Sequence, residues 1–267
     1  MSVTKEAVMQ NKEEAIKSLN RLLESFIDDP NHLKKANLIS YWLKTYVNYI
    51  KFEEQFDPSR LIRYPRGSVV RLDFGFNIGK EFGGLHFAVV IDNDNKRNAD
   101  VLTVIPLSST DGKTVHPRNV DLGIELFQKI NDVQKTLYSN AREELNDLQK
   151  AKEAFVNTVS VLEKIYNTQD EQKTSELTDQ ISAAIEYINE IEDKESSIKK
   201  TIEYLTRNKR EIAKLKTGSM AVVNQITTIS KQRIFTPKRS EDFLYGIKLS
   251  PSAMEKINDK LKELYIH

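Results

Sequence analysis

Cysteine is absent from the 267-residue chain, so neither a disulfide framework nor a thiolate metal site can form. A chain without cysteine is typical of a reducing compartment. The sequence also lacks an apolar run long enough to cross a membrane, and residues 1–29 are charged throughout rather than signal-like. We therefore expect a soluble, cytoplasmic protein that makes no contact with a membrane.

Glycine is missing from residues 1–66 and 124–217, and all nine glycines fall within 67–123 and 218–246. Because glycine suits turns between strands and destabilises helix interiors, this partition predicts a β module split by a helical insertion and preceded by a helical segment. The β module, counted as 60–125 and 216–250, carries fifteen Lys or Arg against ten Asp or Glu, whereas the whole chain has a net charge of +1. A basic module suits a polyanionic ligand, although many domains that bind none reach this balance.

The first 57 residues show helical spacing of apolar side chains. Residues 3–28 predict one helix, which Pro30 ends, and residues 31–55 predict a second with an apolar face. Trp42, Tyr46 and Tyr49 lie beside that face. These aromatic residues either pack in a core or stack on the bases of a nucleic acid.

Short runs of β-branched and aromatic residues predict the strands of the β module. The first three are 68–74, 85–91 and 99–107, with Gly, Asn and Asp between them, as in a β-meander. Residues 113–122 predict a fourth strand, and β structure is expected again at 219–229 and 243–249. A final helix begins with Ser250 as its N-cap and Pro251 at its first position.

Residues 125–166 and 177–212 place apolar residues in steps of three and four, with lapses at Lys152, Glu195 and Lys209. Two such arms joined by a polar turn at 167–170 predict an antiparallel coiled-coil hairpin. Its two ends must lie close together, so a hairpin can be inserted in a barrel loop without disturbing the barrel. Neither arm carries a catalytic constellation, which favours a structural or partner-binding rod.

Several motifs in the β module occur in a recognisable order. They are RG-x-V from Arg66, the loop NIGKEFGG at 77–84, AVVIDND at 88–94 and VIPLSS at 104–109. In this order they resemble the PemK/MazF family of toxin endoribonucleases, and residues 218–234 resemble the second conserved block of that family. The resemblance covers roughly 115 of the 267 residues, in two pieces.

The resemblance implies an α+β fold with a small, half-open MazF-like β-barrel and a C-terminal helix. The barrel is interrupted by the long antiparallel coiled-coil hairpin and preceded by the N-terminal helical segment. The predicted parts are the N-terminal segment 1–57, the first barrel part 58–125, the coiled-coil insertion 126–215 and the second barrel part with the C-terminal helix 216–267.

The resemblance also implies a function: metal-independent cleavage of single-stranded RNA by transesterification, which leaves a 2′,3′-cyclic phosphate and a 5′-hydroxyl. Such toxins are homodimers and are held inactive by an antitoxin protein. The coiled coil and the N-terminal helices are hypothesised to aid dimerisation, contact an antitoxin or restrain the site. The alternative is a non-catalytic, CcdB-like toxin that acts by binding a protein partner.

Metal-independent RNA cleavage needs a base for the 2′-hydroxyl proton and an acid for the leaving oxygen, and histidine titrates in the suitable range. Of the four histidines, His86 follows the glycine loop directly and opens a strand. The family has arginine at the position of His86 and threonine at that of Ser108. We predict that His86 acts as base, acid or both, and that Ser108 orients the phosphate. The alternative is a strand histidine beside a hydroxyl-rich turn that includes Ser109 and Thr110.

Further residues are candidates for RNA contact or for a second imidazole. Lys80 lies in the loop that flanks the RNA groove in the family, Arg71 interrupts the apolar alternation of the first strand, and Gln225 matches a family glutamine near the cleft. Ser109 adjoins Ser108, Lys231 begins the basic run KQRIFTPKR, and His116 lies beside Arg118. No phosphate-binding loop or metal-ligand motif is present, so no metal and no cofactor is expected.

Overall fold

The computed structural model describes residues 3–110, 112, 114–166, 174–212 and 217–266. The chain forms two compact units. Unit 1 comprises residues 1–106 and 225–238, and unit 2 comprises residues 107–224 and 239–267. Unit 1 therefore joins the N-terminal helices to the first strands, whereas unit 2 joins the long helices to the remaining strands and the C-terminal helix.

The sheet of unit 1 is antiparallel and follows the order β3-β2-β1-β7, with β6 paired to β3. Its strands are β1 (Val69–Asp73), β2 (Leu85–Val90), the first part of β3 (Val101–Ser109), β6 (Thr227–Ser230) and β7 (Ile234–Thr236). In the β1–β2 hairpin Val70 lies opposite Ala88 and Leu72 lies opposite His86. Because opposite residues point to the same face, His86 shares the face of the core residues.

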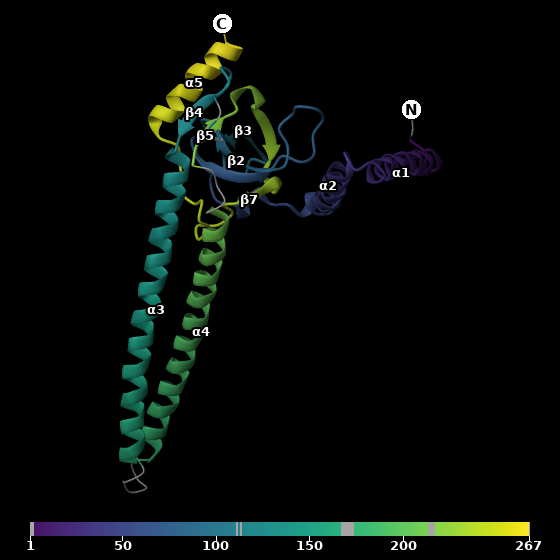
Figure 1. The fold of residues 1–267 in the computed structure, drawn as a ribbon. Coiled ribbons are helices and arrows are strands. Elements are labelled where there is room, and N and C mark those ends of the chain that lie inside the picture. The colour runs from purple at the N-terminus through teal and green to yellow at the C-terminus, as the bar shows by residue number, and fades with distance from the viewer. Residues whose placement is uncertain (1–2, 111, 113, 167–173, 213–216, 267) are drawn as a thin grey trace. The chain divides into compact units, whose positions relative to one another are not determined.

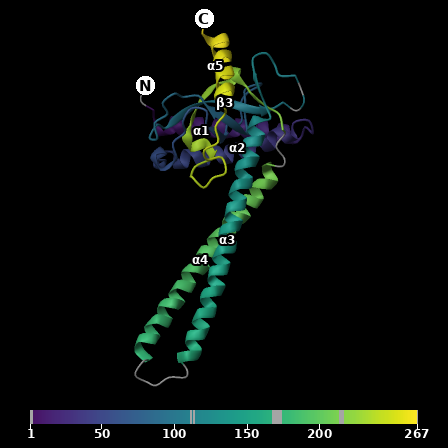
Figure 2. The ribbon, with the colours of Figure 1, turned by 90° about the vertical axis from the view of Figure 1, so that its left-hand side faces the viewer.

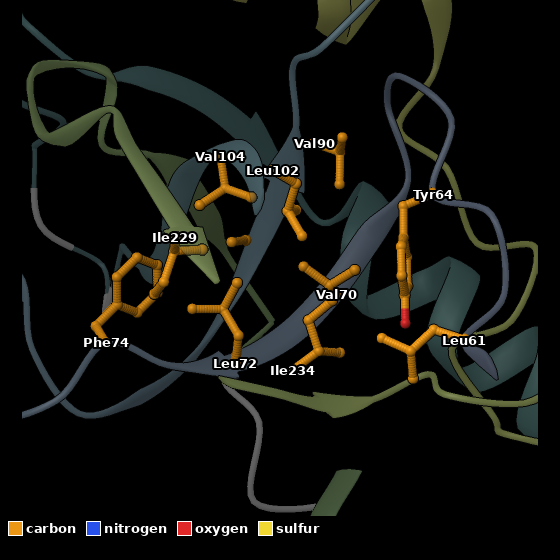
Figure 3. Packing of buried hydrophobic residues seen from close by; sticks show 11 residues of the cluster. Leu61, Tyr64, Val70, Leu72, Phe74, Val90, Leu102, Val104, Ile229 and Ile234 are labelled. Atoms are coloured by element: carbon orange, nitrogen blue, oxygen red, sulfur yellow. The ribbon is translucent and has the colours of Figure 1, made fainter. Parts of the chain in front are cut away.

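The core of unit 1 is formed by apolar side chains from all of its strands and from the segment before β1 (Figure 3). Tyr64 anchors one end, since its ring is buried and its hydroxyl donates a hydrogen bond to the carbonyl of Pro237 at 2.7 Å. Phe74 and Phe82 meet edge to face, with ring centroids 5.2 Å apart. The other buried members are Leu61, Val70, Leu72, Ala88, Val90, Leu102, Val104, Ile229 and Ile234.

Two helices precede the sheet of unit 1: α1 (Lys5–Ile27) and α2 (Leu33–Phe52) (Figure 1). Thr4 caps α1, because its hydroxyl accepts from the Ala7 amide. The predicted apolar stripes are buried only in part: α1 has no buried residue, and α2 buries Ala36 and Ile39. Short 3₁₀ helices at Glu53–Gln55 and Pro58–Arg60 lead from α2 toward β1.

Unit 2 contains a smaller antiparallel sheet and the C-terminal helix. The strands β4 (Val120–Gly123) and β5 (Ser219–Ala221) pair with each other, and β5 pairs with the end of β3. Helix α5 (Pro251–Tyr265) begins as predicted, because the Ser250 hydroxyl accepts from the Ala253 amide at 3.1 Å. Together the two units confirm the predicted α+β class, with an antiparallel sheet that is not closed and helices at both ends and in the middle.

The longest elements are the paired helices α3 (Glu125–Tyr166) and α4 (Thr174–Ile212), both in unit 2. They run side by side in opposite directions, as both views show (Figures 1 and 2). Gln134 is buried between them and donates from its side-chain amide to the Leu205 carbonyl at 2.6 Å. The polar turn predicted at 167–170 lies outside the described residues. None of the helices within the described ranges is long and apolar enough to span a membrane.

Lys152 and Glu195, two of the charged residues that interrupt the apolar pattern, form an ion pair between the two helices. The Lys152 ammonium lies 2.8 Å from Glu192 and 3.6 Å from Glu195. Glu195 also accepts from the Gln149 side chain at 3.3 Å. Hydrogen bonding to Glu192 raises the pKa of Lys152, and hydrogen bonding to Lys199 lowers that of Glu195. The lapses therefore join α3 to α4 at one defined register.

Two strand predictions need correction, and one strand was not predicted. Residues 219–229 do not form one strand, because a 3₁₀ helix at Val223–Gln225 separates β5 from β6. Residues 243–249 form turns with a single bridge at 248 rather than a strand. Strand β7 was not predicted, because it is only three residues long and follows a second 3₁₀ helix at Lys231–Arg233.

Lys152→Glu is expected to lower the thermal stability of unit 2, because it places a third carboxylate beside Glu192 and Glu195. Far-UV circular dichroism on heating measures this loss, which should shrink at high salt because the repulsion is screened. Lys150→Glu is the matched control, since Lys150 is well exposed and pairs with Asp147 of its own helix at 3.8 Å. Equal melting of the two variants would contradict the prediction.

Candidate active site

The site is organised by the tight loop between β1 and β2, within unit 1. The Gly84 amide donates to the Gly75 carbonyl at 2.7 Å, and the Phe74 amide donates to the Gly84 carbonyl at 2.9 Å. The Asn77 side chain spans the loop, donating to the carbonyls of Phe74 and Phe82 at 3.3 and 2.7 Å. These bonds satisfy the backbone of the turn and fix the position at which β2 begins.

Gly75 allows the side chains of Trp42 and Arg233 to approach this loop closely. Its φ is +88°, which favours glycine. A Cβ at this position would lie 2.6 Å from Nη2 of Arg233 and 2.9 Å from Cζ2 of Trp42. Any side chain at residue 75 would therefore force the Trp42 ring and the end of the Arg233 side chain to move.

His86 is half-buried at the start of β2, directly after the loop. Its ring meets the Phe82 ring edge to face, with centroids 4.7 Å apart. Burial lowers the pKa of His86 below 6.5, and the positive charge of Arg71 lowers it further. The imidazole is therefore mostly neutral at neutral pH, and a neutral imidazole can accept a proton.

Arg71 lies on the opposite face of β1 from the core. Its guanidinium is held over two aromatic rings, 5.9 Å from the centroid of Phe87 and 5.6 Å from that of Phe235. Phe87 is its cross-strand partner on β2. The rings fix the cation on the outer face of the hairpin, where it influences His86 through the sheet without contacting it.

Gln225 and Lys80 are brought together at the loop. The Gln225 side chain accepts from the Phe82 amide at 3.3 Å and donates to the Lys80 carbonyl at 3.2 Å. The side chain of Lys80 is exposed. Gln225 therefore joins the second part of the chain to the loop, and this bonding uses both ends of its amide.

The predicted hydroxyl residues lie at the end of β3, in unit 2. Ser108 and Ser109 are half-buried and lie opposite Met220 and Ser219 of β5. The Thr110 amide donates to the Gly218 carbonyl at 3.1 Å. His116, also in unit 2, is exposed and accepts through Nδ1 from the Arg118 amide at 3.2 Å. His116 is thus held in a local turn of the surface.

Lys231 differs from the sequence-based expectation of an exposed cation on a basic hairpin. Its side chain is 0% exposed, and its ammonium donates to the carbonyls of Lys96 and Arg97 at 2.8 and 3.3 Å. Burial lowers its pKa, although Asp92 and Asp100 oppose this shift. Lys231 therefore ties the 3₁₀ helix before β7 to the segment before β3, and its buried ammonium is not available to contact RNA.

A hollow of 730 Å³ beside the loop is lined by two of the aromatic residues noted on the second helix and by Arg233, which was not a candidate. Arg233 lies over the Trp42 ring at 5.0 Å, and the Tyr49 hydroxyl donates to Asp73 at 3.4 Å. Burial, followed by the Asp73 charge, raises the pKa of Tyr49 to about 12. The only sequence signal was the aromatic set on the second helix, because Arg233 stood within a longer basic run. In the part of the chain that the structure describes, no three His, Asp or Glu side chains gather as a metal site requires.

Strands β1 to β4 and the glycine-rich β1–β2 loop lie within a range that is similar to a known family. Residues 65–144 match the family model described as PemK-like, MazF-like toxin of type II toxin-antitoxin system. The matched range begins just before β1 and ends within α3, so the similarity covers less than half of the chain. The second resembling block, 218–234, lies outside the matched range. No curated protein matches the chain.

Arg71→Gln is expected to raise the pKa of His86 while leaving it below 6.5, because burial is the larger cause of the shift. NMR titration of the four imidazoles measures this value, with His86→Ala identifying the resonance. Because the folded pKa is lowered, the favourable contribution of neutral His86 to folding is present above pH 6.5 and lost as the pH falls. Arg60→Gln is the control, since Arg60 is exposed and pairs with Asp57 at 3.5 Å. A wild-type His86 that titrates at or above 6.5 would contradict the prediction.

Proposed function

We propose that the protein is a metal-independent endoribonuclease that cleaves single-stranded RNA, acting as the toxin of a cytoplasmic toxin-antitoxin or phage-defence system. The observation that carries the proposal is the half-buried imidazole of His86, with its lowered pKa, directly after the loop of a PemK/MazF-like domain. The proposed reaction needs no cofactor.

In the proposed reaction His86 removes the proton from a 2′-hydroxyl, whose oxygen attacks the adjacent phosphorus. The bond from phosphorus to the 5′-oxygen breaks, and that oxygen receives a proton, which leaves a 2′,3′-cyclic phosphate and a 5′-hydroxyl. Ser108 orients the phosphate, with Ser109 beside it. Arg71 and Lys80 supply positive charge for the RNA backbone, and Gln225 holds the loop in place.

Purified wild-type protein is expected to cleave a long RNA in the presence of EDTA. His86→Ala should slow cleavage by about 10²–10⁴-fold, the usual contribution of a general acid or base. Ser108→Ala should slow it by roughly tenfold, as expected for one lost hydrogen bond to a charged group. The products are read from their ends by gel electrophoresis after phosphatase and kinase treatment.

His32→Ala is the control for that assay, because His32 lies at the start of α2 beside Asp29 and Phe26. Cleavage by His86→Ala at the wild-type rate would refute the assigned role. A protein that arrests growth but cleaves no RNA would support the second candidate, a CcdB-like toxin that binds a protein. The exposed apolar residues of α1 favour that candidate.

We also propose that the protein binds an antitoxin and forms a homodimer, in which the N-terminal helices take part. The support is the apolar surface of α1, where Val8, Met9, Ile16, Leu22 and Ile27 are all exposed. Exposed apolar residues in this number mark a surface that another protein covers.

Ile16→Glu is expected to convert the dimer to a monomer, because it buries a carboxylate in the proposed interface. Sedimentation velocity measures the mass. Val161→Glu on α3 is the matched control, since Val161 is 55% exposed and Ile16 is 58% exposed. If only Val161→Glu dissociates the dimer, the long helices form the interface instead, and a monomeric wild-type protein would contradict dimerisation altogether.

A further inference from the structure

The hollow of 730 Å³ in unit 1 lies beside the β1–β2 loop but is not part of the catalytic assignment above. Three segments line it: α2 through Trp42 and its neighbours, residues 73–85 of the hairpin, and residues 232–238 around β7. Helix α2 and β7 both lie outside the range that matches the toxin family. The volume is in the range of small-molecule sites in proteins.

Aromatic rings form much of the wall. Trp42 is half-buried, whereas Tyr41 and Phe235 are 63% and 60% exposed although both line the hollow. Large aromatic side chains that stay accessible around a concave surface provide faces on which a flat ring can stack. Stacking of this kind is how proteins hold unpaired bases of single-stranded nucleic acids.

Arg233 has one buried hydrogen-bond donor that has no partner among the described residues. Its guanidinium lies over Trp42, and its Nε is buried without an acceptor among the described residues. The nearby Asp73 carboxylate is already engaged, because it accepts from the Gly75 amide at 2.9 Å and from the Tyr49 hydroxyl at 3.4 Å. A ligand with oxygen or ring-nitrogen acceptors would satisfy the guanidinium.

The charges around the hollow narrow the ligand class. Arg233 and Lys238 are balanced by Asp73 and Glu81, so the lining carries no net positive charge. This balance disfavours a free polyphosphate. A nucleobase fits better, because it presents acceptors to a guanidinium and exocyclic amines to a carboxylate on one neutral ring.

The hollow extends to the residue next to His86, because Leu85 lines it. Gly84 lines the hollow, and a Cβ built on Gly84 would lie 3.7 Å from Nε2 of His86. Residues 84 and 85 therefore connect the hollow to His86, and we infer that an RNA phosphate held at His86 places a neighbouring nucleotide at the hollow. The base that enters it belongs to a nucleotide close to the cleaved bond.

We propose that the hollow formed by α2, the glycine turn and β7 is a nucleobase subsite that selects one unpaired base next to the cleavage position. The inference deepens the proposed nuclease function and rests on it. The ring stacks on the aromatic wall of Trp42, Tyr41 and Phe235, and Arg233 bonds its acceptors. The N-terminal helical segment thus contributes a specificity contact to the RNA site.

The test follows the emission of Trp42, the only tryptophan in the chain. Full-length His86→Ala protein is titrated with short single-stranded RNAs that are identical except for the base at one central position. We expect a saturable change in Trp42 emission and a clear preference for one base. Tyr41→Ser and Arg233→Gln, each added to His86→Ala, should weaken the affinity by roughly tenfold.

Tyr46→Ser is the matched control, because Tyr46 is an exposed tyrosine of α2 near Trp42 that does not line the hollow. The proposal is overturned if RNA binds without changing Trp42 emission, or if Tyr41→Ser and Tyr46→Ser bind equally well. It is also overturned if the emission responds to a peptide but not to RNA, since the hollow would then be a protein-docking site.

The subsite and the nuclease function fail in different ways. If the wild-type protein and Tyr41→Ser cleave RNA at the same sites, the nuclease proposal stands and the subsite proposal is refuted. If RNA binds saturably at Trp42 but the wild-type protein cleaves no RNA, the base-binding hollow is supported and the nuclease proposal is refuted. Cleavage whose preferred base changes in Tyr41→Ser supports both.

Discussion

Trp42 and Arg233 reach the turn before β2 because residue 75 has no side chain. The distances of 2.9 and 2.6 Å that a Cβ would make to them leave no room for alanine unless these two side chains move. The contact brings together three segments that are far apart in sequence. It places Trp42 and Arg233 beside the loop, where both line the hollow.

The β1–β2 hairpin places its histidine and its arginine on opposite faces. His86 shares its face with Leu72 and the core, whereas Arg71 lies on the other face between Phe87 and Phe235. The family has arginine where this chain has His86, so the resemblance predicts a cation at that position. Here the cation is on the adjacent strand, and the position after the glycine loop holds a group that can transfer protons.

Much of the architecture follows from sequence patterns, because glycine positions, period and capping residues act locally. The helix start at Ser250 and Pro251, the β1–β2 hairpin and the two long helices are of this kind. Lys231 is the contrasting case: a lysine in a basic run is expected at the surface. Its burial depends on the carbonyls of Lys96 and Arg97, which the fold brings from another part of the chain. Arg233 was missed for the same reason, since its partner Trp42 is distant in sequence.

The ion pairs of Lys152 with Glu192 and Glu195 join the two long helices at one polar position among their apolar contacts. These ion pairs restrict how the two helices can change in length. If residues are inserted or deleted in one helix beyond the ion pairs, an equal change is needed in the other. Otherwise the apolar side chains of α3 and α4 beyond that position are no longer in register. Matched insertions or deletions in both helices would therefore preserve the apolar contacts beyond the ion pairs and leave the base of the hairpin unchanged.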